Sequence, residues 1–383
     1  MFNFSITKDE FFKRHFEQKP FFQKGALQPE YVSWSDINEF LYLLDPTAPF
    51  LRVFKDGALQ ESEFAESYFE HGLPRRRIKK RAFYDLLGDG ATAVLNRLEF
   101  ASSKVRRLCL AISSYAGGHA IANGYLAFGG TGTFGKHWDT HDVFAVQLIG
   151  RKHWRVYEPT VQVPLRDQTS RFVKDTCPET PVFDQILEPG DVLYIPRGWW
   201  HEAAPSEGET FHVAIGVHLP TITDYVIWCS NEYLKAYEEC RYSFPQNEHS
   251  SADFTLIGNI VTKELTSLSN IEQFRRAWAT NMKISTPLDV DLFNPSLPNN
   301  LGLTAQLVLN SNMWADRPGN PLTRNEAPDR RGELSDEIIA LLSHHDHLSV
   351  ERLMEECKPS SSDQVLQIIH ALIKENAVIV LNY

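Results

Sequence analysis

Hydrophobic residues follow a short, strand-like pattern through the middle of the chain. Between about residues 105 and 218, apolar runs such as VFAVQLIG, DVLYIP and FHVAIGVHL are separated by glycine, proline, aspartate and asparagine. We expect no amphipathic helix here, and LCLAISSY at 108–115 is predicted to be one more strand. Recurring short strands between turn residues are typical of a β-sandwich or barrel of about eight strands.

Before this region, the pattern predicts two helices, which short apolar runs follow. TKDEFFKRHFE at 7–17 is predicted to be a helix, with Thr7 as its N-cap and Glu10 completing a capping box. WSDINEFLYLLD at 34–45 is the second predicted helix, and PFLRVF at 49–54 is a short apolar run bounded by turn signals.

Beyond Pro220, apolar residues recur every three to four positions, which predicts helices within 223–244 and 251–282. Aromatic residues gather on these helices, which favours a buried dimer interface, with packing on the barrel as the alternative. They are Tyr225, Trp228, Tyr233, Tyr237, Phe274 and Trp278.

The C-terminal region resembles a winged-helix unit, because it reads as three helices and a strand. These are predicted at 335–346, 349–357, 361–376 and 377–381, after a linker at 285–300 and a polar loop at 314–333. Residues 333–383 carry three basic and nine acidic side chains. A DNA-reading module needs the opposite sign, so we expect a protein-interaction or packing module.

Length and composition predict a protein of two or three domains: 383 residues, 43% of them hydrophobic. The net charge of -11 argues against a duplex nucleic-acid binder and leaves room for a basic protein or peptide partner. Five cysteines without a CxxC pair favour a reducing, cytoplasmic location. The first residues have neither the signal-peptide nor the membrane-anchor pattern, so no membrane association is expected.

The stretch GKHWDTHDVF at 135–144 concentrates metal-binding side chains. On a strand, His137 and Asp139 point to the same side, whereas His141 joins them only if the strand stays regular. His201 follows a Pro-Arg-Gly turn in DVLYIPRGWWHEA, and strand pairing can fold it back onto the first pair. Two histidines and one carboxylate form the facial triad of non-haem Fe(II) oxygenases. Surface polar residues at strand ends are the alternative.

Lys152, in GRKHWRVY, adds a cation on the next strand of the barrel. From there its side chain can reach the barrel mouth and pair with the distal carboxylate of a dicarboxylate co-substrate. A solvated lysine is the alternative. His153 alternates to the other side of the strand, so it and His141 are interpreted as structural.

Two long phrases, GYLAFGGTGTFGKHWDTHDVFAVQLIGRKHWRVYEP and LEPGDVLYIPRGWWHEA, resemble the JmjC group of 2-oxoglutarate oxygenases. GDGATAVLNRLEF and FFKRHFEQKPFFQKG are similar to the ribosomal oxygenases within that group. The likeness covers about residues 5–220. It implies a mainly β catalytic domain of the double-stranded β-helix (cupin jelly roll) type at 1–219. A helical dimerisation segment at 220–284 and a winged-helix-like α+β domain at 285–383 would follow.

The resemblance also implies roles for individual residues. The expected Fe(II) ligands are His137, Asp139 and His201, with 2-oxoglutarate and O2 as co-substrates. The expected co-substrate residues are Lys152, on the 5-carboxylate, then Asn123 and Tyr125 in the pocket, and His212 behind them.

The resemblance implies a protein hydroxylase acting on an arginine or another side chain of a ribosomal protein. The sequence departs from some bacterial arginine hydroxylases, which have arginine in place of Lys152 and serine in place of Phe128, so the target residue is left open. The alternatives are a hydroxylase or demethylase of another peptide, and a non-catalytic cupin that only binds 2-oxoglutarate. The basic run PRRRIKKR at 74–81 is interpreted as a solvated face, with binding of ribosomal RNA or an acidic partner as its alternative.

Overall fold

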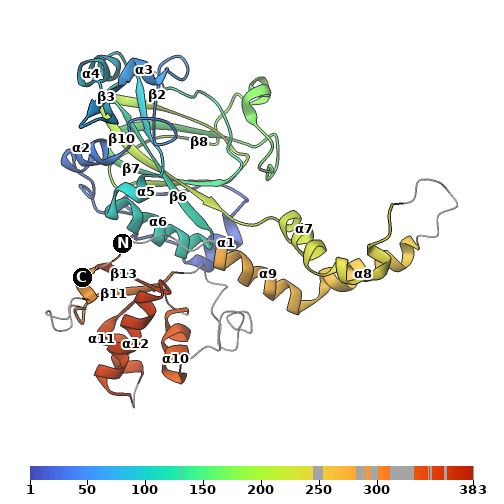
Figure 1. Cartoon of the computed structure of the whole chain (residues 1–383). Coiled ribbons are helices and arrows are strands. Elements are labelled where there is room, and N and C mark those ends of the chain that lie inside the picture. The colour runs from blue at the N-terminus through green and yellow to red at the C-terminus, as the bar shows by residue number, and fades with distance from the viewer. Residues whose placement is uncertain are drawn as a thin grey trace. The chain divides into compact units, whose positions relative to one another are not determined.

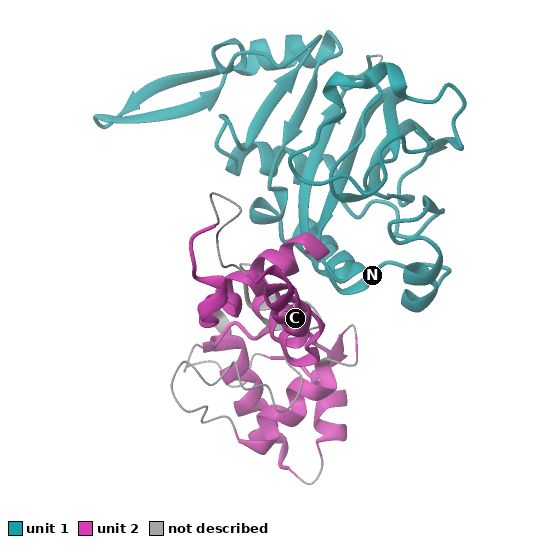
Figure 2. Cartoon of the chain, turned by 90° about the vertical axis from the view of Figure 1, so that its right-hand side faces the viewer, with its two compact units in different colours: residues 1–218 teal, residues 219–383 magenta. Residues whose placement is uncertain are grey.

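The computed structural model of the chain forms two compact units, Met1–His218 and Leu219–Tyr383 (Figure 2). It describes residues 1–130, 132–244, 253–281, 288, 290–293, 301–310, 332–343, 345, 347–357 and 360–382. The predicted linker at 285–300 and polar loop at 314–333 lie mostly outside these residues. The three-domain division stays a prediction.

The first unit is built on an eight-stranded antiparallel sheet (Figure 1). Its strands, in spatial order, are β1 (Phe21–Gln23), β9 (Val192–Ile195), β7 (Asp142–Tyr157), β10 (Trp200–His218), β6 (His119–Ala127), β5 (Thr92–Leu95) and β2 (Leu51–Phe54), and β8 (Phe183–Leu187) also pairs with β7. This agrees with the mainly β prediction. Three of the strands, however, precede residue 105, and the stretch from 105 to 218 supplies five.

β7 and β10 form the longest pairing and carry the middle of the sheet. The predicted runs VFAVQLIG and HWRVYEP are one continuous strand, β7. The register shifts between Pro205 and His212, next to Gly150. Gly150 has φ +66°, and a Cβ there would lie 1.9 Å from the carbonyl oxygen of Glu209. Glycine is therefore required where the two strands cross closely at the irregularity.

One predicted strand is wrong, because LCLAISSY lies in a helix. α6 (Ser103–Ala116) begins at Ser102, whose side chain accepts a hydrogen bond from the backbone N–H of Val105. It ends at Gly117, which has a left-handed conformation. Buried residues recur at helical spacing on its inner face, at Val105, Leu108, Cys109, Ile112 and Ala116. The apolar run therefore belongs to a helical stripe and not to a buried strand.

The two helices predicted near the N-terminus are present. α1 (Lys8–Arg14) has the capping box of Thr7 and Glu10, and α2 (Trp34–Leu43) has an equivalent one at Ser33 and Asp36. The remaining helices of the first unit are α3 (Glu61–Phe64), α4 (Lys80–Gly88), α5 (Leu98–Ala101) and the 3-10 turns η1 (Ser170–Phe172) and η2 (Lys174–Thr176).

A two-stranded hairpin was not predicted. β3 (Ala65–Glu70) and β4 (Leu73–Ile78) pair only with each other and project from the first unit (Figure 2). His71 and Gly72 at the turn have φ values of 49° and 80°. Positive φ at both central residues is typical of the tight turns that fit the twist of a hairpin.

The second unit begins with helices whose aromatic side chains meet inside the chain. α7 (Ile222–Glu232) places Tyr225 and Trp228 against Phe274 of α9 (Leu268–Asn281), with ring centroids 5.2 and 5.4 Å apart. α8 (Phe254–Thr266) and the turns η3 (Leu234–Ala236) and η4 (Glu238–Cys240) complete this segment. At least part of the predicted aromatic face is therefore internal packing.

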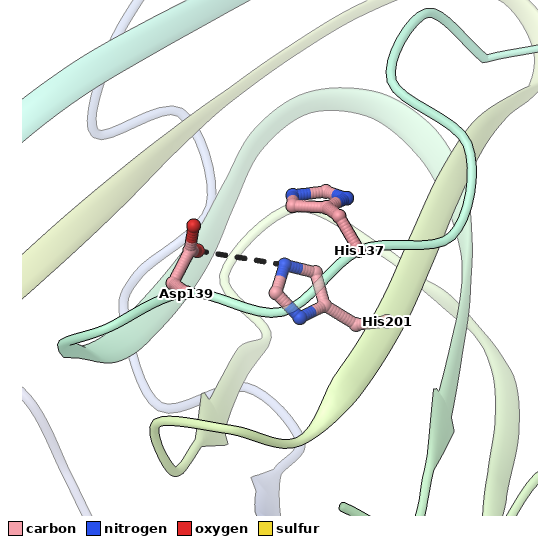
Figure 3. Close-up of side chains that lie close together, drawn as sticks. All are labelled: His137, Asp139 and His201. Carbon is pink, nitrogen blue, oxygen red and sulfur yellow. Dashed lines mark ion pairs between the residues drawn. The ribbon is translucent and has the colours of Figure 1, made fainter. Parts of the chain in front are cut away.

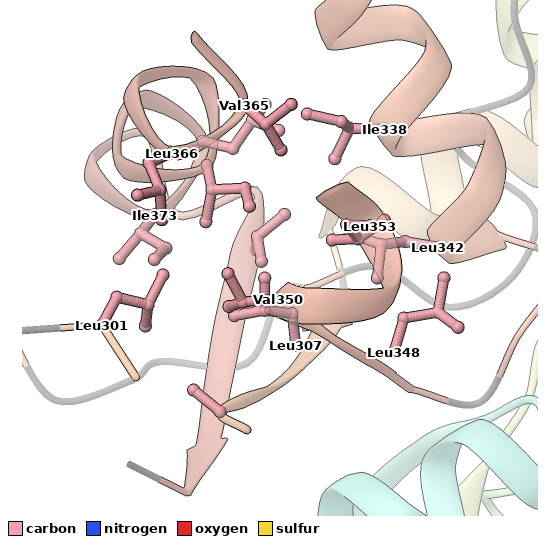
Figure 4. Packing of buried hydrophobic residues seen from close by; sticks show 14 of the residues in the cluster. Leu301, Leu307, Ile338, Leu342, Leu348, Val350, Leu353, Val365, Leu366 and Ile373 are labelled. Atoms are coloured by element: carbon pink, nitrogen blue, oxygen red, sulfur yellow. The ribbon is translucent and has the colours of Figure 1, made fainter. Parts of the chain in front are cut away.

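The C-terminal part of this unit contains the predicted helices and strand in the predicted order. They are α10 (Glu333–Ser343), α11 (Val350–Glu356), α12 (Ser362–Lys374) and β13 (Val378–Asn382), preceded by η5 (Val290–Phe293). Two unpredicted strands, β11 (Gln306–Leu309) and β12 (Leu348–Ser349), join β13 in a three-stranded sheet. Leu307, Ile338, Leu353 and Val365 are buried between the sheet and the helices (Figure 4).

None of the helices in the described parts of the chain has both the length and the apolar character that crossing a bilayer requires.

Candidate metal centre and adjoining cavity

Three side chains from two distant segments meet in the first unit (Figure 3). His137 and Asp139 precede β7, and His201 is the second residue of β10. Their potential ligand atoms all lie within 4.8 Å of one another, and Asp139 Oδ2 is 3.6 Å from His201 Nε2. Among the residues that the structure describes, this is the only such cluster of three or more histidine, cysteine or acidic residues.

Backbone hydrogen bonds bring the two segments together. The N–H of His137 donates to the carbonyl of His201 at 3.0 Å, and the N–H of His201 donates back at 2.7 Å. The N–H of Gly198, in the turn before β10, donates to the carbonyl of Asp139 at 2.9 Å. Trp138 alternates to the other side, where it is buried near Trp200. The predicted alternation therefore holds, and main-chain pairing fixes the distance between the ligand candidates.

Both histidines have one ring nitrogen occupied by a backbone carbonyl. Nδ1 of His137 is 2.9 Å from the oxygen of Gly135, and Nδ1 of His201 is 3.0 Å from the oxygen of Trp199. Because a carbonyl only accepts, each Nδ1 carries a hydrogen, which leaves Nε2 as the atom of each ring that can ligate a metal. This is the arrangement by which outer hydrogen bonds orient metal-binding histidines.

The electrostatics of the cluster suit a cation. Burial and the nearby His137 lower the pKa of His201 to about 4, so its imidazole is neutral at neutral pH. Burial works against ionisation of Asp139, but the imidazoles of His137, His141 and His201 lower the pKa of the carboxyl below its usual value. The site therefore offers the neutral imidazole of His201 and the carboxylate of Asp139, with the imidazole of His137 beside them.

The neighbouring polar residues have other partners. His141 stacks on His218 with ring centroids 4.6 Å apart, outside the cluster. Asp142 accepts a hydrogen bond at 2.9 Å from the N–H of Arg197, which anchors the turn leading to His201. His153 forms an ion pair with Asp184 on β8. These placements agree with a structural role for His141 and His153.

A cavity of about 270 Å³ adjoins the three side chains and is lined by all of them. Lys152 also lines it and is the only cationic side chain in its described walls. The lysine is 6% exposed, and burial lowers its pKa to about 7. Its Nζ lies 3.2 Å from His212 Nδ1. No ion pair joins Lys152 to a carboxylate among the residues described, so its amino group is available to an acidic ligand in the cavity.

Of the other three predicted co-substrate residues, two line the cavity and one does not. Tyr125 and His212 line the cavity, with their rings stacked 4.7 Å apart. Burial and the nearby Asp139 raise the pKa of Tyr125, so its hydroxyl stays protonated. Asn123 is absent from the cavity wall, and its Oδ1 accepts a hydrogen bond from the N–H of Arg97 at 3.2 Å. The roles of all three stay predictions.

Sequence reasoning missed two aromatic walls of the cavity. The ring of Trp154 is near those of His201 and His212, with centroid distances of 6.3 and 5.3 Å. Phe134 lies 6.2 Å from His137 by the same measure. Trp154 stands two positions after Lys152, so strand alternation places both on one face and gave a usable signal. Phe134 lies in a glycine-rich loop with no such periodicity.

Comparison with known proteins assigns the segment that holds this site to a protein family. Residues 93–225, which include the three clustered side chains and Lys152, match the JmjC domain model. The chain contains a JmjC domain. The resemblance noted in the sequence is thereby confirmed, together with the cupin-type β fold that belongs to it.

Curated proteins and solved structures resemble the chain over different lengths. "Ribosomal oxygenase 1" of Danio rerio is 30% identical over 228 residues, which cover 57% of this chain and 39% of that one. "Bifunctional lysine-specific demethylase and histidyl-hydroxylase NO66" of Caenorhabditis elegans is 38% identical over 112 residues, covering 28% and 15%. This chain spans less than half the length of these curated relatives. The Escherichia coli ribosomal oxygenase YcfD has a similar fold over 99% of both chains, with a TM-score of 0.57 and 16% identity.

Proposed function

We propose that the chain is an Fe(II)- and 2-oxoglutarate-dependent dioxygenase that hydroxylates a protein side chain. One observation carries the proposal. One ring nitrogen from each of two histidines and one carboxylate oxygen lie within 4.8 Å of one another, on a cavity that is also lined by one buried lysine. A metal donor set next to a buried lysine that has no carboxylate partner suits a metal-chelating dicarboxylate better than a neutral ligand.

The residues present fit Fe(II). His137 and His201 would supply imidazole nitrogens, and Asp139 would supply one carboxylate oxygen. Such a set is typical of non-haem iron sites that leave positions for other ligands. Bound Fe(II) supplies the O2 activation that couples decarboxylation of 2-oxoglutarate to substrate hydroxylation. The hydrogen bonds at both Nδ1 atoms hold each imidazole in the tautomer that can ligate.

Lys152 is proposed to bind the distal carboxylate of 2-oxoglutarate. A carboxylate at its Nζ favours the protonated ammonium, which burial alone disfavours. His212, Tyr125 and Trp154 surround this end of the cavity and limit the access of water, which strengthens the charge pair. The similarly folded YcfD, with a TM-score of 0.56, has been solved in complex with cobalt and 2-oxoglutarate, which supports a metal and a dicarboxylate as the ligands proposed for this cavity.

The proposed substrate is a ribosomal protein, modified on an arginine or histidine side chain. Similarity to proteins named ribosomal oxygenase and histidyl-hydroxylase supports a protein side chain as the target, and the second name also includes lysine demethylation. We also propose that the chain forms a homodimer through its helical segment. Exposed apolar residues there support this, since Ile222 and Leu268 are 81% and 83% exposed. A cytoplasmic location stays a prediction.

The test is iron-dependent conversion of 2-oxoglutarate to succinate in the presence of ribosomal protein peptides. We expect turnover with the wild type and with His153→Gln, a histidine change outside the cluster, and none with His201→Ala or Asp139→Ala. Mass spectrometry of the peptide separates the outcomes, because hydroxylation adds one oxygen atom and demethylation removes a methylene. A wild type that binds neither Fe(II) nor 2-oxoglutarate contradicts the proposal. Tight 2-oxoglutarate binding without turnover on any peptide would instead favour a non-catalytic scaffold.

A further inference from the structure

The projecting hairpin has no function in the site described above. Residues 65–81, called the basic arm from here on, comprise β3, β4 and the start of α4 (Figure 2). From Glu66 to Arg77 every residue is at least partly exposed, and the two strands pair only with each other. Isolated two-stranded hairpins are marginally stable in water. The arm therefore presents its side chains to solvent without contributing a core of its own.

The charge of the arm is opposite to that of the chain. The whole chain carries a net charge of -11, whereas the arm has six basic and two acidic residues. Arg75, Arg76 and Arg77 pair with carboxylates on or beside the hairpin at 3.4, 3.9 and 2.7 Å. Their side chains remain 56%, 54% and 61% exposed. Exposed ion pairs of this kind are weak, so another anion can replace the carboxylates.

Each face of the hairpin carries one aromatic ring and at least one of these arginines, Tyr68 with Arg75 and Arg77 and Phe69 with Arg76. The guanidinium of Arg77 lies 4.8 Å from the ring centre of Tyr68, which is paired in register with Arg75. On the other face, Phe69 is paired with Pro74 near the turn and is 79% exposed. A phenylalanine this exposed buries little of its own apolar surface in the fold, so its ring is available to a ligand.

We propose that the basic arm binds RNA at unpaired nucleotides, with the arginines on phosphates and Phe69 stacked on a base. Single-stranded RNA combines regularly spaced phosphates with bases whose faces are free, and proteins bind it with cations and exposed aromatic rings. An acidic protein segment would use the arginines but gives the Phe69 ring no partner. A nucleic-acid duplex keeps its bases stacked and favours a broad basic surface, which the net charge of -11 opposes. This inference does not depend on the proposed dioxygenase activity.

The test measures binding of the full chain to a labelled, mixed-sequence single-stranded RNA by fluorescence anisotropy at several salt concentrations. The triple variant Arg75→Gln, Arg76→Gln, Arg77→Gln should bind at least about tenfold more weakly at low salt. The slope of log K against log salt should fall by about 2, because each phosphate contact on a single strand contributes about 0.7. The matched control Lys13→Gln, Lys19→Gln, Lys24→Gln removes the same charge from exposed positions outside the arm, and it should bind as the wild type does.

A second variant separates stacking from charge. Phe69→Ser keeps every charge and should weaken binding about tenfold with little change in the salt slope, because stacking on an aromatic ring is not ionic. Its melting temperature, compared with that of the wild type, shows whether the arm variants stay folded. The proposal is overturned if the wild type does not bind RNA, or if the control loses as much affinity as the arm variant. It is also overturned if a poly-glutamate peptide binds the arm more tightly than RNA does.

Discussion

Replacing Lys152 by methionine should make the ligand-free protein more stable while removing 2-oxoglutarate binding. The lysine is buried, and burial lowers its pKa from 10.5 to about 7. Each pKa unit corresponds to about 1.4 kcal/mol, so keeping this ammonium inside the fold costs about 5 kcal/mol at pH values below 7. Methionine fills a similar volume without the charge, at the loss of the contact with His212, which contributes about 1 kcal/mol. We expect a net gain of about 3 kcal/mol at neutral pH.

The pH dependence has a definite sign. Between pH 7 and pH 10.5 the unfolded lysine holds its proton and the folded one does not, so the wild type gains stability as pH rises through this window. The advantage of Lys152→Met is therefore largest below pH 7 and disappears as pH approaches 10.5.

Urea denaturation followed by tryptophan fluorescence measures this effect, because Trp154 lines the same cavity as Lys152. Lys13→Met, at an exposed position of α1, is the control and should change the free energy of unfolding by less than about 0.5 kcal/mol. Calorimetric titration with 2-oxoglutarate gives the second readout. A Lys152→Met protein that is less stable than the wild type, or that binds 2-oxoglutarate unchanged, refutes the reasoning.

Three further changes test the surroundings of the site. Asp142→Asn should stabilise the protein by about 4 kcal/mol near pH 8 and leave it unchanged below pH 3.8 in urea titrations. Burial raises the pKa of this carboxyl from 3.8 to about 7, so the wild type loses stability as pH rises between these values. Gly198→Ala should lower the free energy of unfolding by about 3 kcal/mol and weaken metal binding, because Gly198 has φ +83° and an added Cβ would lie 2.4 Å from the carbonyl oxygen of Val161. Gly208→Ala is the control, with φ +60° and open space around the added Cβ, and should lower the free energy of unfolding by about 1 kcal/mol. Mn²⁺ should raise the melting temperature of the wild type and not that of His201→Ala in a thermal-shift assay, because only the intact cluster binds the ion in the folded state.

Much of the fold was predictable wherever local signals agreed. The capping boxes at Thr7 and Ser33 and the spacing of apolar residues after Pro220 mark helices that the structure contains. α6 was mispredicted because eight consecutive residues looked like a buried strand. The N-cap at Ser102 and the C-terminal Gly117, which mark a helix, both lie outside these eight residues. The β3–β4 hairpin was missed because both of its faces are exposed, so its strands lack the alternation that a buried face imposes.

The site was predictable in its parts and not in its assembly. Strand alternation placed His137 and Asp139 on one side, and Lys152 was singled out as a cation on the neighbouring strand. The approach of His201 depends on backbone pairing between segments far apart in sequence, which spacing alone does not determine. The tautomers of both histidines depend on carbonyls of the chain itself, and the hydrogen bond from the N–H of Arg97 to Asn123 Oδ1 joins residues 26 positions apart. Such contacts are properties of the folded backbone.

The most direct test of the metal centre is anomalous diffraction from crystals grown with Mn²⁺ and 2-oxoglutarate under anaerobic conditions. The account predicts one strong anomalous peak within bonding distance of Nε2 of His137, Nε2 of His201 and the carboxylate of Asp139. A metal bound elsewhere in the first unit, or no peak among these three side chains, contradicts it.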